Sequence, residues 1–179
     1  YDRLAAPALA ALQPDLVIST WAGGFSEAMG AATRDELAAA GINSYVTPVN
    51  CANGDPDASA EDVAKNQEQS YESSFELIEE IGLIFDVQHD AMHLIEHARE
   101  DIEAIVPPAT EGDVHVLLAY PGMSMMAENG VPGVFAGPFV DSIIEASGGV
   151  NSFPDFATLN DSSSISAEAL AAADVDVLV

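Results

Sequence analysis

The chain has few basic residues: four Lys and Arg stand against 30 Asp and Glu among 179 residues, and the formal net charge is −26. Proteins that bind nucleic acid neutralise phosphates with clustered Lys and Arg, and anionic lipid surfaces attract a basic patch in the same way. The composition therefore excludes a nucleic-acid partner and disfavours docking on a membrane surface. The simplest interpretation of the many acidic residues is that they keep the protein soluble.

Other features are also scarce or missing. Cys51 is the single cysteine, so it is either a free thiol or pairs with a cysteine outside this sequence. No run of 18 apolar residues predicts a membrane span. Neither Gly-x-Gly-x-x-Gly nor a phosphate loop ending in Gly-Lys-Ser/Thr occurs, so nucleotide binding by the familiar loops has no support. Because the sequence starts at Tyr1 without a Met and stops inside an expected strand at Val179, we expect a piece of a longer protein.

Helix and strand signals alternate along the chain, and apolar residues make up 49% of it. Thr33 and Glu36 form a capping box that predicts the start of a helix, and Gly41 ends that helix. Buried strands are predicted at 16–19, 44–47, 115–119 and 175–179. The alternation predicts an α/β fold with a parallel sheet in each half.

One short pattern occurs near both ends of the chain. Its four residues are first Leu9, Ala10, Ala11 and Asp15, and then Leu170, Ala171, Ala172 and Asp176. An apolar run follows the Asp in both copies, so each copy predicts a helix, a turn and a buried strand. A unit used near each end indicates two similar α/β lobes, which more often grip a ligand than build one continuous core.

A long helical stretch, residues 87–106, lies between the halves and is stopped by Pro107 and Pro108. Twenty residues of helix span about 30 Å, the width of a small domain. The expected organisation is therefore an N-terminal α/β lobe over 1–86, a bridging helix over 87–108 and a C-terminal α/β lobe over 109–179.

Five segments carry a resemblance to a known family: 10–18, 36–42, 77–85, 143–151 and 166–170. In this order they resemble the ABC-transporter substrate-binding proteins that capture ferric siderophores, haem or cobalamin, the class III periplasmic binding proteins. The resemblance implies two Rossmann-like lobes joined by one long helix and truncated at both ends, with the ligand in the cleft between them. It further implies an extracytoplasmic monomer, periplasmic or lipid-anchored at the cell surface, that delivers its ligand to an ABC permease without being an enzyme and without a cofactor. Val175 departs from the family, which commonly has Pro there.

Trp21 is the first candidate ligand-binding residue, because it follows a predicted strand and precedes two glycines. Ligands of open α/β sheets gather beyond the carboxyl ends of the strands, where a Trp offers a flat apolar face. The vitamin B12-binding members of the family carry Trp-x-Gly-Gly at this point. The alternative is a Trp that fills the core beneath a loop. Tyr45 and Phe156 are weaker candidates on the same reasoning.

Tyr120 ends a predicted strand of the second half, and a Gly/Pro-rich loop with three Met follows it. Met123 and Phe135 belong to this loop, which predicts a soft, adaptable apolar wall for a large ligand. A loop that packs its own side chains is the alternative. The resemblance adds one surface glutamate on each lobe, Glu27 and Glu145, that docks on Arg residues of the permease.

His89, His93 and His97 recur at i, i+4 and i+8 and look like a metal stripe. On a helical wheel they lie away from the apolar face, so we expect them in solvent rather than in a buried metal site. A Glu after the first His, which a zinc protease requires, is missing. Ser124 loosely resembles the nucleophile of a serine hydrolase, but the final Gly of that motif is absent and His115 is the only His in that half.

The charge of the ligand can also be predicted. The four cations are Arg3, Arg34, Lys65 and Arg99, and none clearly lies at the carboxyl end of a strand. Burying an anion needs cationic partners. We therefore expect a neutral or cationic ligand, a ferric hydroxamate or a corrinoid, rather than a catecholate or haem. The alternatives left open are an α/β enzyme with a catalytic cleft and a Zn or Mn uptake protein that uses the His ladder.

Overall fold

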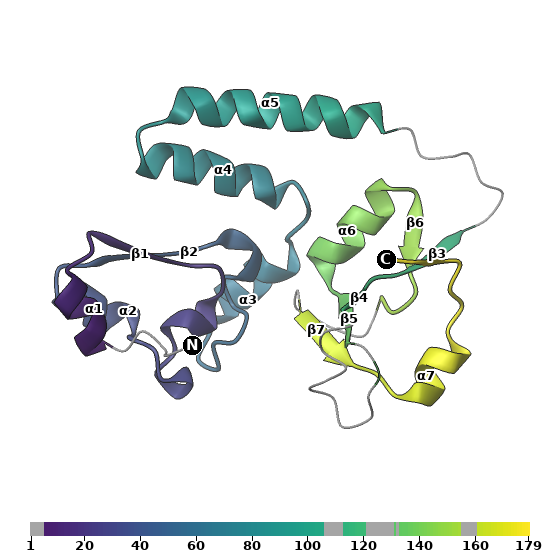
Figure 1. Ribbon diagram of the computed structural model, residues 1–179, viewed down its shortest axis with the longest axis horizontal. Helices are drawn as coiled ribbons and strands as arrows, with labels where there is room; N and C mark the ends of the chain where they lie inside the picture. Colours follow the sequence, from purple (N-terminus) through teal and green to yellow (C-terminus); the bar gives the residue numbers. More distant parts are fainter. Residues whose placement is uncertain (1–5, 106–112, 121–130, 132, 155–160) are drawn as a thin grey trace. The chain divides into compact units, whose positions relative to one another are not determined.

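The computed structural model of the protein, shown in Figure 1, describes residues 6–105, 113–120, 131, 133–154 and 161–179. By packing, the chain divides into two units, residues 1–66 and 67–179. The α-helices of the first unit are α1 (Ala6–Leu12), α2 (Arg34–Ala39) and α3 (Ala60–Gln67), the last of which ends at the first residue of the second unit. The strands of the first unit are β1 (Leu16–Ser19) and β2 (Asn43–Val46). The helices of the second unit are α4 (Ser73–Ile84), α5 (Gln88–Ala104), α6 (Pro138–Ala146) and α7 (Ala167–Ala172). Its strands are β3 (Val114–Leu117), β4 (Ala119–Tyr120), β5 (Gly133–Ala136), β6 (Gly149–Asn151), β7 (Asp161–Ser164) and β8 (Val177–Leu178).

In the first unit, β1 and β2 form a parallel pair in which Leu16 is opposite Asn43. One face of this pair is covered by α1 and α2 (Figure 1). The core between them consists of Leu9, Phe25, Ala32, Leu37 and Ile42, with Val17 and Val46 packed against it. Because side chains alternate along a strand, Ile18 and Tyr45 lie on the opposite face.

The helix α2 begins where its sequence requires. The Thr33 hydroxyl accepts a hydrogen bond from the Glu36 backbone N–H at 3.2 Å, and the Thr33 backbone N–H donates to the Glu36 carboxylate at 2.9 Å. The predicted capping box is therefore confirmed. After the helix, Gly41 adopts a φ of +77°, which a residue with a Cβ rarely adopts, and the chain turns into β2.

In the second unit, α4 and α5 lie side by side as a hairpin (Figure 1). Gly82 permits their close approach, since a Cβ there would lie 2.7 Å from the Cβ of Ala91. Ala91 is buried and Ile95 and Ala98 are half-buried, whereas Leu94 is 56% exposed. The apolar positions of the predicted helix therefore divide between a face that packs on α4 and an exposed face.

Two small sheets make up the rest of the second unit. A parallel sheet has the order β6-β3-β8, and an antiparallel sheet has the order β4-β5-β7. Leu117, Val131, Val134 and Ile165 form the buried core beside them. The antiparallel sheet differs from the all-parallel expectation, since β5 pairs antiparallel with both β4 and β7.

Asn151 connects the parts of this unit. Its buried side chain donates to the Asp141 carboxylate of α6 at 2.6 Å and to the Phe135 carbonyl of β5 at 3.4 Å, and accepts from the Phe153 N–H at 2.9 Å. The amide thereby joins β6, α6 and β5 and explains why this position is polar although it is only 4% exposed.

The helix–turn–strand order predicted near both ends is present as α1–β1 and α7–β8. The prediction that both strands are buried is wrong, because β8 is exposed and β1 is at most half-buried. The long helix predicted over 87–106 is present as α5. The division into lobes at 1–86, 87–108 and 109–179 stays a prediction. Among the residues described, none of the helices is both long and apolar enough to span a membrane.

Candidate ligand-binding site

Trp21 lies just beyond the carboxyl end of β1. The Ser19 hydroxyl donates to the Trp21 carbonyl at 2.7 Å, and a 3₁₀ helix, Ala22–Phe25, follows. The Gly23 N–H donates to the Asn53 carbonyl at 3.0 Å and so joins this turn to the loop that follows β2. Two loops at the carboxyl ends of the two parallel strands are thereby held together, which is the usual location of ligands in such sheets.

The Trp21 ring rests on two glycines. A Cβ at Gly23 would lie 2.5 Å from Cζ3 of the ring, and a Cβ at Gly54 would overlap the same atom. Gly54 also has a φ of +73°. The ring is only partly buried. One side of the indole therefore packs on the two glycines. Because the ring is only partly buried, Trp21 is not a fully buried core residue.

Two cavities border these loops. The first, about 370 Å³, is lined by Trp21 together with Val17, Ile18 and Met29. The second, about 780 Å³, is lined by residues from both loops and from the start of α2, among them Phe25, Ser26, Cys51 and Asp55. Phe25 borders both cavities, so they share a wall.

The larger cavity has an acidic lining. Its charged residues are Glu27, Arg34, Asp35, Asp55 and Asp57. The guanidinium of Arg34 is exposed and donates through Nε to the Ser44 hydroxyl at 3.1 Å. With four carboxylates and one guanidinium, the cavity favours neutral or cationic groups over anions.

Cys51 lines the same cavity and forms no disulfide in the structure. Burial raises the pKa of its thiol; the charge of Lys65 lowers it and that of Asp62 raises it further. The thiol donates to the Asp62 carbonyl at 3.6 Å. The group is therefore a protonated, hydrogen-bonded thiol rather than a reactive nucleophile.

Of the other predicted ligand residues, Tyr45 lies within β2 on the face away from the core and lines neither cavity. Tyr120 on β4 and Phe135 on β5 come together, with ring centroids 6.0 Å apart and an interplanar angle of 47°. Tyr120 is 51% exposed. Met123 and Phe156 lie outside the described residues. The roles of all six, Trp21 included, stay predictions.

The two glutamates assigned to permease docking are both exposed. Glu27 begins a short 3₁₀ helix, Glu27–Met29, and Glu145 lies in the last turn of α6. Glu27 also lines the larger cavity, so it is adjacent to the candidate ligand site. The docking role stays a prediction.

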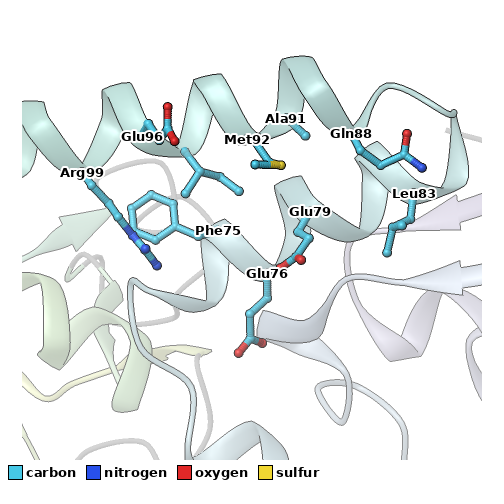
Figure 2. A pocket seen from close by; sticks show the side chains of 10 residues that line it. Phe75, Glu76, Glu79, Leu83, Gln88, Ala91, Met92, Glu96 and Arg99 are labelled. Atoms are coloured by element: carbon cyan, nitrogen blue, oxygen red, sulfur yellow. The ribbon is translucent and has the colours of Figure 1, made fainter.

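A separate groove of about 380 Å³ runs between α4 and α5 (Figure 2). Arg99 reaches from α5 over the ring of Phe75, 4.9 Å from its centroid, and pairs with Glu72 at 3.1 Å. This cation is therefore already partnered. Of the remaining cations, Lys65 is exposed in the last turn of α3, and Arg3 lies outside the described residues.

The residues that suggested other chemistries lie on α5, on β3 or outside the described residues. His89, His93 and His97 are exposed on α5, as the helical wheel predicted. His115 on β3 lies 3.9 Å from the Asp174 carboxylate, and Ser124 lies outside the described residues. Within the described part of the chain, no three or more His, Cys, Asp or Glu side chains are grouped to hold a metal ion.

Sequence reasoning missed Gly54, which the Trp21 ring contacts, and Asp55 and Asp57, which line the larger cavity. All three belong to the segment that follows β2. Its position directly after the β2 strand was the available signal, because loops at neighbouring carboxyl ends meet at one edge of a parallel sheet.

The fold and this site define an α/β protein with a candidate ligand site at the carboxyl ends of its parallel strands. The family model described as periplasmic binding protein matches residues 7–179. The chain therefore belongs to the periplasmic binding protein family. No curated protein sequence matches the chain.

Solved structures share this fold at low sequence identity. A periplasmic binding protein from Veillonella parvula matches with a TM-score of 0.72 and 16% identity, over 97% of this chain and 51% of that one. An ABC-type Fe³⁺-hydroxamate transport protein from Saccharomonospora viridis matches with 0.63 and 22%, over 90% and 48%. The periplasmic haem-binding protein of Vibrio cholerae matches with 0.63 and 20%, over 98% and 57%. The chain thus spans about half the length of these proteins.

Proposed function

We propose that this chain is part of an extracytoplasmic solute-binding protein that captures a metal chelate, a ferric siderophore or a corrinoid, and delivers it to an ABC importer. The family is one of solute-binding proteins, which supports binding without turnover. The binding-competent form is proposed to be a monomer.

The observation that carries the proposal is the partly buried Trp21 ring beside an acidic cavity. A flat indole is suited to the apolar surface of a large chelate. Four carboxylates against one exposed guanidinium make the same region unfavourable for a polyanion, because a buried anion needs cationic partners. The proposed ligand is therefore neutral or cationic: a ferric hydroxamate or a corrinoid, in preference to a ferric catecholate or haem.

The test is a titration of the full chain with a ferric hydroxamate, a ferric catecholate, haem and cobalamin, followed by the fluorescence of Trp21, the single Trp. We expect the hydroxamate or the cobalamin to quench the emission at the lowest concentration. Because salt screens the long-range field of the chain, titrations at low and high salt separate the effect of this field from the contacts that the ligand makes in the cavity. A catecholate that outcompetes the hydroxamate at both salt concentrations would refute the assignment of ligand charge.

Variants locate the site. Trp21→Ala should weaken binding of the preferred chelate, measured by calorimetry, whereas Leu12→Ala should not. Leu12 is a matched control, because it is an apolar side chain of the same unit, is 70% exposed and lines neither cavity. Equal affinities in all three proteins would show that Trp21 does not bind the ligand.

The docking proposal concerns Glu27 and Glu145, which are exposed. Their simultaneous replacement by Lys should abolish uptake through the permease. Glu145→Lys alone should leave the solution affinity for the chelate unchanged, because Glu145 lines neither cavity. The same change of charge at Glu100 and Glu103, exposed on α5, is the control and should leave uptake intact. Loss of solution affinity in Glu145→Lys would instead place this glutamate in ligand binding.

A further inference from the structure

The helix α5 carries three histidines at successive turns, His89, His93 and His97. All three are exposed, and the His93 side chain is 64% exposed. The rings of His89 and His93 lie edge to face, with centroids 4.6 Å apart. His93 also approaches the Glu96 carboxylate, 3.8 Å from Nδ1. The structure thus distinguishes one pair of rings, His89 and His93, within the ladder.

Two imidazoles one helical turn apart can bind one metal ion. Imidazole nitrogens bind zinc at about 2.0–2.1 Å, which places two nitrogens of one ion about 3 Å apart. Rings whose centroids are 4.6 Å apart reach this arrangement by rotation about their side-chain bonds, and exposed side chains rotate rapidly. The helix itself is already formed, so the two ligands need no rearrangement of the backbone.

We propose that His89 and His93 form a surface chelate for a divalent transition-metal ion, preferentially Cu²⁺ and then Ni²⁺ or Zn²⁺. No larger group of ligands surrounds the pair in the described residues, so water completes the coordination. Imidazole favours these ions over Mn²⁺, and Mg²⁺ and Ca²⁺ prefer oxygen ligands. The site is independent of the proposed chelate ligand, because it uses neither Trp21 nor the cavities beside it.

The negative charge of the chain attracts metal ions to the His89–His93 pair but does not select one metal ion over another. A net charge of −26 attracts every cation, and Glu96 and Asp90 lie near the pair on the same helix. Carboxylates alone would bind the hard ions as well as the transition metals. Discrimination of Cu²⁺ and Ni²⁺ from Mg²⁺ is therefore the property that identifies the two imidazoles as ligands.

Calorimetric titration of the full chain with Cu²⁺ and Ni²⁺, in excess Mg²⁺ to saturate the carboxylates, tests the proposal. We expect one ion per chain. His89→Ala and His93→Ala should each bind it about tenfold or more weakly, because one of only two protein ligands is lost. His97→Ala is the matched control, an exposed histidine of the same helix, and should bind as the unchanged protein does.

Circular dichroism checks that α5 is intact in each variant. The electron paramagnetic resonance spectrum of the Cu²⁺ form should show two nitrogen ligands, of which His89→Ala retains one. Binding that survives in the His89→Ala, His93→Ala double variant would overturn the proposal, since carboxylates would then hold the ion. Equal loss in His97→Ala and His89→Ala would also overturn the assignment to this pair.

Discussion

Replacing Gly54 by Ala should displace the Trp21 ring and destabilise the first unit. Two costs add at this position. The backbone has a φ of +73°, and a residue with a Cβ in the left-handed region costs about 1–2 kcal/mol. The new methyl group also overlaps Cζ3 of Trp21, and overpacking of this kind costs about 1–3 kcal/mol. The expected loss in the free energy of unfolding is therefore about 2–5 kcal/mol.

Gly41→Ala separates the two costs. Gly41 has a φ of +77°, almost the same as Gly54, but a Cβ there meets no atom within 4 Å. This variant should lose only about 1–2 kcal/mol, the backbone part. The difference between the two variants, about 2 kcal/mol, measures the packing of the Trp21 ring on Gly54. At a denaturant slope of about 2 kcal/mol/M, the urea midpoint of Gly54→Ala should lie about 1 M below that of Gly41→Ala.

Urea unfolding followed by Trp21 fluorescence gives both readouts. In Gly54→Ala the native emission should change as well as the midpoint, because the ring must move, whereas Gly41→Ala should keep the native emission. Equal midpoints for the two variants, together with an unchanged native emission, would refute the contact between Trp21 and Gly54.

Three further predictions follow from single contacts. Thr33→Ala removes the capping box of α2 and should lower the free energy of unfolding by about 1 kcal/mol in urea denaturation, whereas Thr33→Ser should retain most of it. Asn151→Ala leaves the Asp141 carboxylate without its 2.6 Å donor and should cost about 1.5–3 kcal/mol; an effect below that of Thr33→Ala would contradict the connecting role of the amide. Because burial raises the pKa of Cys51, its alkylation by iodoacetamide near neutral pH should be slower in the folded than in the urea-unfolded chain, and Lys65→Ala should slow it further. By linkage, the stabilising contribution of the thiol is complete below the ordinary thiol pKa and is lost as the pH rises through the raised pKa of the folded state.

Features that depend on neighbouring residues were predictable from the sequence. The capping box of Thr33 and Glu36 lies within one helical turn, and the residues that form its hydrogen bonds are adjacent in the chain. The exposure of the three histidines follows from the helical period alone once 87–106 is taken as a helix. The repeated helix–turn–strand unit was readable for the same reason, because each copy is a short local segment.

The resemblance to the family depended on the order and spacing of five segments, 10–18, 36–42, 77–85, 143–151 and 166–170, more than on any one of them. The family match over residues 7–179 confirms it. Trp21 could be assigned to the end of a strand, because strand β1 precedes it directly. The position of Trp21 after a strand follows from the order of neighbouring residues, whereas its contact with Gly54 does not.

Tertiary structure alone decided which distant residues meet. Gly54 lies far from Trp21 in the sequence, and only the parallel pairing of β1 and β2 brings their loops together. The contact of Tyr120 with Phe135 likewise requires the antiparallel pairing of β4 with β5, which the alternation of helix and strand did not reveal. The acidic lining of the larger cavity was hidden among 30 carboxylates, because a sequence counts charges but does not say which of them share a cavity. Periodicity records contacts within an element, whereas a site is built from the ends of several elements, and their relative positions are determined by packing.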